Sequence, residues 1–289
     1  MNKLAAVLKL VRIEHSIMSA VAVIAAELIA GRLPGLPLLL LSLVAPVFLN
    51  MTSFAINDYF DIETDRLNKK KRPLVTGDLA PDTALYITGI TLVVGVAASY
   101  FINTACFEIA IIFGIFDVLY SYKLKDILLV GNSYVALSMA IAFVYGSYVV
   151  TPALGPAITI VTVLVFFSGM AREIHGTIRD YRGDLRARGA KTLPMAIGMR
   201  SASMIAFALY LCSALLGVYL FLYVAPFRLN IAYSLIFGVA MAMLFYVGVI
   251  FITSKRQKDY DRTRNISLAA MAIAIIALLI APLAPFAYI

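Results

Sequence analysis

The chain has 289 residues, of which 62% are hydrophobic and 14% are charged, and its mean hydropathy is +0.94. This composition excludes a water-soluble globular domain, because so large an apolar surface is stable only in a bilayer. The formal net charge of +8 does not indicate a nucleic-acid-binding protein, because the basic residues flank apolar stretches without interleaved aromatic residues. Attraction to anionic lipid headgroups or to an anionic substrate is the better interpretation.

Nine apolar stretches of membrane-spanning length follow one another along the chain. In chain order they are 17–33, 37–56, 84–102, 105–122, 128–150, 154–171, 202–224, 231–253 and 266–285. Each is close to the ~20 residues that cross the hydrocarbon layer, and helices satisfy every backbone polar group within it. The first is too long for a cleavable leader. We therefore predict an all-α integral membrane protein, a bundle of nine transmembrane helices forming one polytopic domain over residues 1–289.

Basic residues gather at alternate ends of these stretches. Of the 24 Lys and Arg residues, all but Arg32 and Arg228 precede the first stretch or lie in the loops after the second, fourth, sixth and eighth. Cytoplasmic loops carry this excess of positive charge. We therefore expect a multi-pass protein of the cell membrane. Its amino terminus and the motif loops near 57–83 and 172–200 are expected to face the cytoplasm.

A polar stripe runs along the end of the second apolar stretch. Residues 57–65 read NDYFDIETD, in which Asn57, Asp61 and Asp65 follow at steps of four and Asp58 lies beside Asn57. Side chains four residues apart share one face of a helix. We predict that this face looks into a cavity rather than at lipid.

A second acidic motif, DYRGD, places Asp180 and Asp184 four residues apart after the sixth stretch. The second and sixth stretches end on the same side of the membrane, so the two motifs are predicted to meet. A helix carboxyl terminus is already partly negative, so these carboxylates require a compensating cation. Carboxylates without His or Cys partners suit Mg²⁺, which completes its shell with water and substrate phosphate. Neighbouring Arg and Lys side chains would hold the remaining phosphate charge.

A simpler interpretation is that the acids neutralise the basic run at 69–72 on a solvated loop. Two separate clusters, each with carboxylates four residues apart, favour a paired diphosphate–metal site, because a solvated loop has no need of that spacing.

The sequence resembles the UbiA superfamily of membrane prenyltransferases. NDYFDIETD is similar to the first aspartate-rich motif of that family, and DYRGD is similar to the second. The resemblance extends to KKKRPL after the first motif, to YSYKLK at the end of the fourth stretch, to the GN that opens the fifth, and to GAKTLP after the second motif. It covers the whole chain and implies a membrane prenyltransferase with nine helices.

The resemblance also implies the roles of particular residues. The carboxylates expected to be catalytic and to bind Mg²⁺ are Asp58, Asp61, Asp65, Asp180 and Asp184. The residues expected to bind the isoprenyl diphosphate donor are Asn57, Arg66, Arg72, Tyr120, Lys125, Asn132 and Lys191. Such a site would stabilise the diphosphate as the allylic C–O bond ionises, and an acceptor would capture the carbocation. Embedding in the membrane would supply an apolar groove for the tail and would exclude water.

The acceptor is indicated by the stretch SGMAREIHGTIRDYRGD, which is most similar to the archaeal branch that makes digeranylgeranylglyceryl phosphate. That resemblance implies transfer from geranylgeranyl diphosphate to the free hydroxyl of geranylgeranylglyceryl phosphate, forming the second ether bond of archaeal lipids. In VRIEHS, however, Glu14 and His15 stand where that branch more often has Pro and Asn. A His there is also similar to aromatic-ring prenyltransferases, so an acceptor of the 4-hydroxybenzoate or naphthoate type is the alternative.

Four residues are expected to contact the acceptor: His15, Asp117, Arg182 and Arg186. Asp117 is included because an intramembrane carboxylate is costly. The two arginines are included because a lipid phosphate would need cationic contacts beyond those of the donor. His175 is open between a packing residue and a base.

A transporter is a distant alternative, because its site would lie near the bilayer midplane rather than at helix ends. We expect membrane lipids around the protein, and neither nucleic acid nor an obligate protein partner. The tail length of the donor, the number of metal ions and the oligomeric state stay open at this point.

Overall fold

The computed structural model describes residues 2–67, 70–187, 192–254 and 256–283, and over 182–187 it describes the backbone. Its helices are α1 (Lys3–Leu10), α2 (Ile13–Ile29), α3 (Leu36–Phe60), α4 (Ile62–Leu67), α5 (Pro73–Thr76), α6 (Pro81–Tyr100), α7 (Thr104–Tyr122), the 3-10 turn η1 (Leu124–Asp126), α8 (Val130–Val150), α9 (Pro156–Ala187), α10 (Leu193–Ile197), α11 (Met199–Tyr223), α12 (Ile231–Thr253) and α13 (Gln257–Leu283). The described residues include no strand. The predicted all-α class is confirmed.

Eight helices are long and apolar enough to cross a membrane: α3, α6, α7, α8, α9, α11, α12 and α13. Helix α2, which occupies most of the first predicted span, has 17 residues and is not among these eight. The count of nine spans therefore stays a prediction. What the structure establishes is an all-helical bundle with the features of a multi-pass membrane protein.

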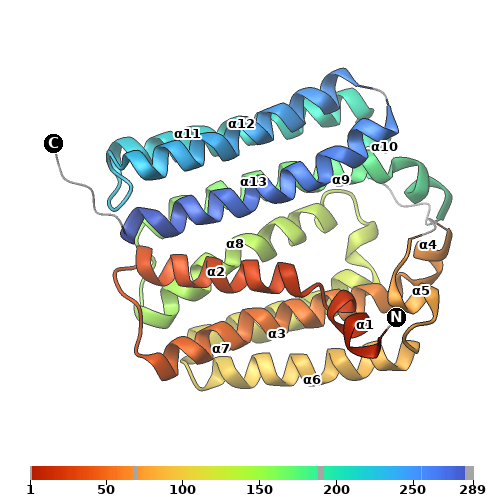
Figure 1. Cartoon of the computed structure of the whole chain (residues 1–289), viewed down its shortest axis with the longest axis horizontal. Helices are drawn as coiled ribbons and strands as arrows, with labels where there is room; N and C mark the ends of the chain where they lie inside the picture. The colour runs from red at the N-terminus through yellow and green to blue at the C-terminus, as the bar shows by residue number, and fades with distance from the viewer. Residues whose placement is uncertain (1, 68–69, 188–191, 255, 284–289) are drawn as a thin grey trace.

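The long helices run side by side, and the short ones gather at one end of the bundle (Figure 1). Six helices close a ring by successive packing, in the order α2, α8, α9, α11, α12, α13 and back to α2. Helix α3 packs on α2, α6 and α7, and it extends the bundle on the other side of α2. The short helices α1, α4, α5 and α10 lie at the end where α3 and α9 finish (Figure 1). Both acidic motifs therefore fall at this end.

The helices approach closely where small residues face each other. At the crossing of α2 and α8, a methyl group built on Gly146 would lie 2.7 Å from both the Val23 carbonyl oxygen and the Ala26 Cβ. Small residues at helix crossings let backbones pack tightly in membrane proteins. Polar contacts also join the helices: the Thr52 and Thr91 hydroxyls are 2.7 Å apart between α3 and α6, and Asn50 donates to Ser19 at 2.7 Å between α3 and α2.

We predict that Gly146→Ala lowers the melting temperature of the purified protein in detergent. The added methyl group would push α2 and α8 apart, and overpacking of this kind costs roughly 1–3 kcal/mol. Gly238→Ala is the matched control, because it is also a helical glycine but no atom lies within 4 Å of the position of its added methyl group. A Gly146→Ala protein that melts at or above the temperature of the control would contradict this packing.

Candidate active site

A cavity of about 1040 Å³ opens among helices α2, α3, α7, α8, α9, α12 and α13. Its lining changes from charged to apolar along each helix that borders it. On α9 the lining passes from Asp180 to Leu164, and on α13 it passes from Asp261 to Leu278. The charged end lies where α3 and α9 finish and α13 begins. The site is thus a polar mouth that continues into an apolar interior.

Three carboxylates of the first motif are almost fully buried beside this mouth. Asp58 is 3% exposed, Asp61 7% and Asp65 1%. Helix α3 ends at Phe60, but backbone bonds from Asp61 to the Asn57 carbonyl and from Asp65 to the Asp61 carbonyl, at 3.0 and 2.7 Å, carry the helical path into α4. The predicted spacing of four residues is therefore retained. Asp58 lines the cavity, whereas Asp61 and Asp65 do not.

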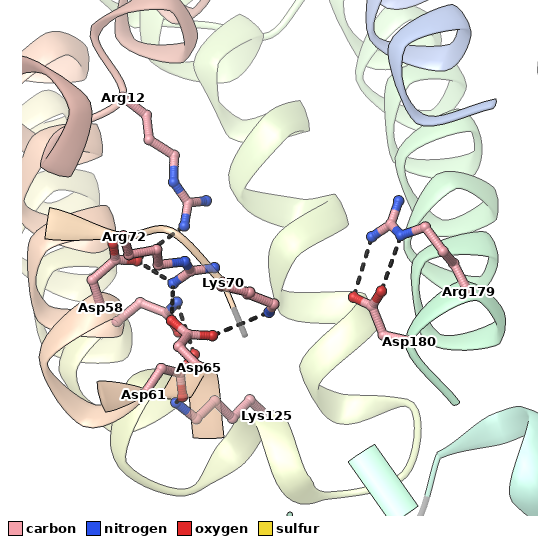
Figure 2. A network of polar contacts seen from close by, with 10 residues as sticks. Arg12, Asp58, Asp61, Asp65, Lys70, Arg72, Lys125, Arg179 and Asp180 are labelled. Carbon is pink, nitrogen blue, oxygen red and sulfur yellow. Dashed lines mark hydrogen bonds and ion pairs between the residues drawn. The ribbon is translucent and has the colours of Figure 1, made fainter. Parts of the chain in front are cut away.

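Basic side chains engage all three carboxylates (Figure 2). Asp58 is paired with Arg12 at 3.0 Å and with Arg72, while Arg72 also lies 2.8 Å from Asp65. Lys70 is 3.1 Å from Asp65, and Lys125 is 2.6 Å from Asp61. Asn57 adds a hydrogen bond of 3.2 Å to Asp61. A buried carboxylate left without such partners would be strongly destabilising, so the cations are a condition for this cluster to exist. We call these three carboxylates and their four basic partners the carboxylate–cation cluster.

Local backbone geometry positions Arg72. It directly precedes Pro73, the first residue of α5, and has the extended conformation, with φ −96° and ψ 149°. The residue before a proline is restricted to this region by the proline ring. Arg72 is thereby held where it pairs with two carboxylates at once.

The Arg12 backbone is strained. Arg12 is the residue before α2 and adopts the left-handed conformation, with φ 45° and ψ 61°, which non-glycine residues rarely adopt. Its guanidinium donates to Asp58 and lies 4.5 Å from the Phe54 ring centroid. Burial and the nearby Arg72 lower the pKa of this guanidinium, and the ion pair with Asp58 opposes that shift. The contacts with α3 offset the backbone strain.

A glycine on α8 positions Lys125. A methyl group on Gly131 would lie 2.8 Å from the Lys125 Cα and 3.0 Å from its carbonyl oxygen. Only a residue without Cβ lets the turn η1 approach α8 so closely. The GN pair noted in the sequence therefore has a structural reason, which is to seat the lysine that pairs with Asp61.

The second motif faces the cluster from α9 (Figure 2). Asp180 lines the cavity and accepts two hydrogen bonds from Arg179, at 3.0 and 3.2 Å. The side chain of Asp184 lies outside the described residues. Within the part of the chain that is described, no three His, Cys, Asp or Glu side chains are grouped to hold a metal ion. The described aspartates of the two motifs are each engaged by Arg or Lys.

The donor set nevertheless fits a hard cation. Asp58 and Asp180 border one cavity with carboxylate oxygens, and both oxygens of Asp65 are buried without a hydrogen bond although they have ion-pair partners. Mg²⁺ takes one or two carboxylates and fills its other positions with water and phosphate. Such a site needs no protein cage of three ligands.

The other predicted donor-binding residues divide into two groups. Tyr120 and Asn57 line the cavity, as does Arg72. Arg66 is exposed on α4, and Asn132 is half-buried at the start of α8; neither lines the cavity. Lys191, which is also predicted to bind the donor, lies outside the described residues.

The predicted acceptor residues divide in the same way. His15 lines the cavity beside Phe54, with ring centroids 5.3 Å apart. Asp117 does not line it: this buried carboxylate accepts a hydrogen bond of 2.8 Å from Tyr134. Its partner is a tyrosine of the neighbouring helix, and the acceptor role expected of Asp117 stays a prediction. The side chains of Arg182 and Arg186 lie outside the described residues.

His175 is a packing residue for most of its surface. It is 4% exposed and stacks on Phe251 with a centroid distance of 4.1 Å and an interplanar angle of 4°. Its Nδ1 is 3.5 Å from the Tyr210 hydroxyl.

Several cavity residues were not singled out by the sequence analysis: Arg12, Lys70, Arg172 and Arg264. Most of them were interpreted only as charges that orient the protein in the membrane. Position in the sequence does not separate such charges from site residues, because both lie at helix ends. Glu173 lies seven residues before Asp180 on α9 and also lines the cavity.

The site is thus a cavity with a charged mouth and an apolar interior inside an all-helical bundle whose long helices could cross a membrane. Residues 18–269 match the UbiA prenyltransferase family. The chain belongs to this family of membrane transferases.

Individual relatives agree with the family assignment. A curated relative from Archaeoglobus fulgidus named digeranylgeranylglyceryl phosphate synthase is 30% identical over 275 residues, which cover 94% of each chain. A solved structure described as "Structural and mechanistic insights into the biosynthesis of Digeranylgeranylglyceryl phosphate synthase in membranes" is similar with a TM-score of 0.74 and 25% identity, covering 98% of this chain and 99% of that chain. A UbiA homologue from Archaeoglobus fulgidus bound to GPP and Mg²⁺ has a TM-score of 0.65 and 22% identity, covering 94% and 99%, and shows the common fold.

We predict that Arg72→Met lowers the free energy of unfolding by about 3 kcal/mol, because it removes one partner from two buried carboxylates. The measurement is thermal or denaturant unfolding in detergent. Arg66→Met is the control: it removes the same charge from an exposed position outside the cavity, and the melting temperature should not change. If the two variants melted together, the carboxylate–cation cluster would not hold this end of the bundle.

Proposed function

We propose that the protein transfers a geranylgeranyl group from geranylgeranyl diphosphate to geranylgeranylglyceryl phosphate, forming the second ether bond of an archaeal-type membrane lipid. The name of its relatives supports this assignment. The structural observation that carries it is one cavity with an apolar interior and, among the residues described, eight basic side chains in its lining. Both proposed substrates are anions with long isoprenoid tails, so both match this combination.

Mg²⁺ is the proposed metal, and the Mg²⁺-bound homologue supports it. The residues that would hold it are the carboxylates of the two motifs, with Asp58 and Asp180 placed on the cavity itself. When bound, the ion neutralises charge that develops on the diphosphate leaving group.

The side chains of this protein supply the rest of the chemistry. Lys70, Lys71 and Arg72 line the mouth, where they would form charge-assisted hydrogen bonds with the donor diphosphate. As the allylic C–O bond breaks, its electron pair leaves with the diphosphate. The acceptor hydroxyl oxygen then bonds to the allylic carbon, and its proton passes to the released diphosphate.

The apolar part of the cavity protects this reaction. Met139, Phe143, Leu164 and Leu244 line it, so water that would capture the carbocation is excluded. We place the charged mouth at the cytoplasmic face of the cell membrane, because basic residues concentrate at that end of the helices.

The acceptor can be identified with purified protein, Mg²⁺ and labelled geranylgeranyl diphosphate. One reaction contains geranylgeranylglyceryl phosphate and another contains 4-hydroxybenzoate, which is included because His15 lines the cavity. We expect a labelled ether lipid in the first reaction and no product in the second. A labelled aromatic product with no ether lipid would instead assign the protein to the quinone-type prenyltransferases.

A further inference from the structure

A second set of basic side chains lines the cavity on the wall formed by α9 and α13. Arg172 and Arg179 come from α9, and Arg264 comes from α13. Helices α9 and α13 pack against each other, and α13 also packs against α2. These arginines are separate from the carboxylate–cation cluster, whose members come from the α1–α2 junction, α3, α4, the segment before α5, and η1.

The donors of this second set are only partly used by the protein. Arg179 is engaged in two hydrogen bonds with Asp180. Arg172 pairs through Nη1 with Glu173 at 3.0 Å, but its Nε is buried and has no hydrogen-bond partner. The Arg264 side chain makes no hydrogen bond or ion pair with any described part of the chain. Two guanidinium groups that line the cavity on one wall therefore have N–H donors that no described residue uses.

The cavity lining also carries an excess of positive charge. Eight basic side chains line it, against five acidic ones among the residues described. Lys70 and Arg72 belong to the cluster on the other side of the mouth, where the proposed donor diphosphate binds. A reaction that joins two phosphorylated lipids must hold a second anion at the same time. Guanidinium groups suit that task, because their planar N–H donors match phosphate oxygens in pairs.

We propose that Arg172 and Arg264 form a monophosphate-binding subsite that holds the phosphate of the acceptor lipid. This inference rests on the proposed function and assigns the acceptor headgroup to the wall between α9 and α13. The same two helices continue the wall with Val165, Leu268, Met271 and Ile275. The tail of the acceptor would lie along these residues, while its headgroup is held by the two arginines.

The test combines two changes: one arginine is removed from the protein, and the phosphate is removed from the acceptor lipid. Each change is made alone and then both are made together. Arg264→Gln and Arg172→Gln are assayed with geranylgeranylglyceryl phosphate and with geranylgeranylglycerol, which lacks the phosphate. We expect KM for the phosphorylated acceptor to rise about 10-fold or more in each variant, the size expected for loss of a hydrogen bond to a charged group. KM for the donor, and the kinetics with the unphosphorylated acceptor, should stay at wild-type values.

Arg262→Gln is the matched control, because Arg262 lies on the same helix two residues away, is exposed and does not line the cavity. Arg264→Lys retains the charge and should recover part of the lost affinity. Equal rises in KM for both acceptors, or an equal effect of Arg262→Gln, would overturn the subsite.

The wild-type protein separates this inference from the proposed function. If it transfers to geranylgeranylglyceryl phosphate while both Gln variants keep wild-type KM, the subsite alone is wrong. If it does not transfer to that acceptor at all, the proposed function is wrong and the subsite fails with it.

Discussion

The structure depends on the burial of three carboxylates at the end of α3. Moving a carboxylate out of water costs several kcal/mol, and an opposite charge must be close to offset it. The offsetting charges come from three parts of the chain that are far apart in sequence: Arg12, the neighbouring pair Lys70 and Arg72, and Lys125. The cluster therefore ties the start of α2, the segment before α5 and the turn after α7 to the end of α3.

The same cluster prepares the mouth of the cavity for an anionic substrate. Its cations are held in place before any ligand arrives, which reduces the reorganisation that catalysis requires. Asp58 and Arg72 belong to the cluster and also line the cavity. In the proposed reaction, phosphate oxygens and Mg²⁺ would enter a site that already alternates negative and positive groups. Structural pairing and substrate binding therefore use the same side chains.

Much of the fold could be predicted from hydropathy and helical spacing. The long apolar stretches correspond to helices, and the interval of four between Asp61 and Asp65 persists across the break between α3 and α4. The count of spans was harder, because α2 begins at Ile13 and ends at Ile29, earlier at both ends than the apolar stretch 17–33. The apolar stretch includes the residues around Gly31, but that glycine has φ 122° and lies in a turn, so the helix ends before the apolar stretch does.

Two partners of the acids, Lys70 and Arg72, lie in the basic run at 69–72 that the sequence already places beside them. The pairing of the acids with Arg12 and Lys125 could not be predicted, because these contacts are long-range. Arg12 and Asp58 are 46 residues apart, and Lys125 and Asp61 are 64 apart. The sequence correctly implied that cations must compensate the carboxylates, and the family resemblance selected Arg72 and Lys125 as site residues, but no signal in the sequence pairs Arg12 with Asp58 or Lys125 with Asp61. Asp117 illustrates the same limit: its hydrogen bond to Tyr134 joins two helices whose contact no local pattern indicates.

The central claim is that the cluster and Asp180 form a Mg²⁺-dependent diphosphate site at the mouth of the cavity. The most direct test is calorimetric titration of the protein with geranylgeranyl thiolodiphosphate. In this unreactive analogue, sulfur replaces the oxygen that joins the allylic carbon to the diphosphate. We predict binding in Mg²⁺ that weakens at least about 10-fold in EDTA or in Asp180→Asn, as expected when a charge-assisted contact is lost. Equal affinity with and without Mg²⁺, in both proteins, would contradict the account.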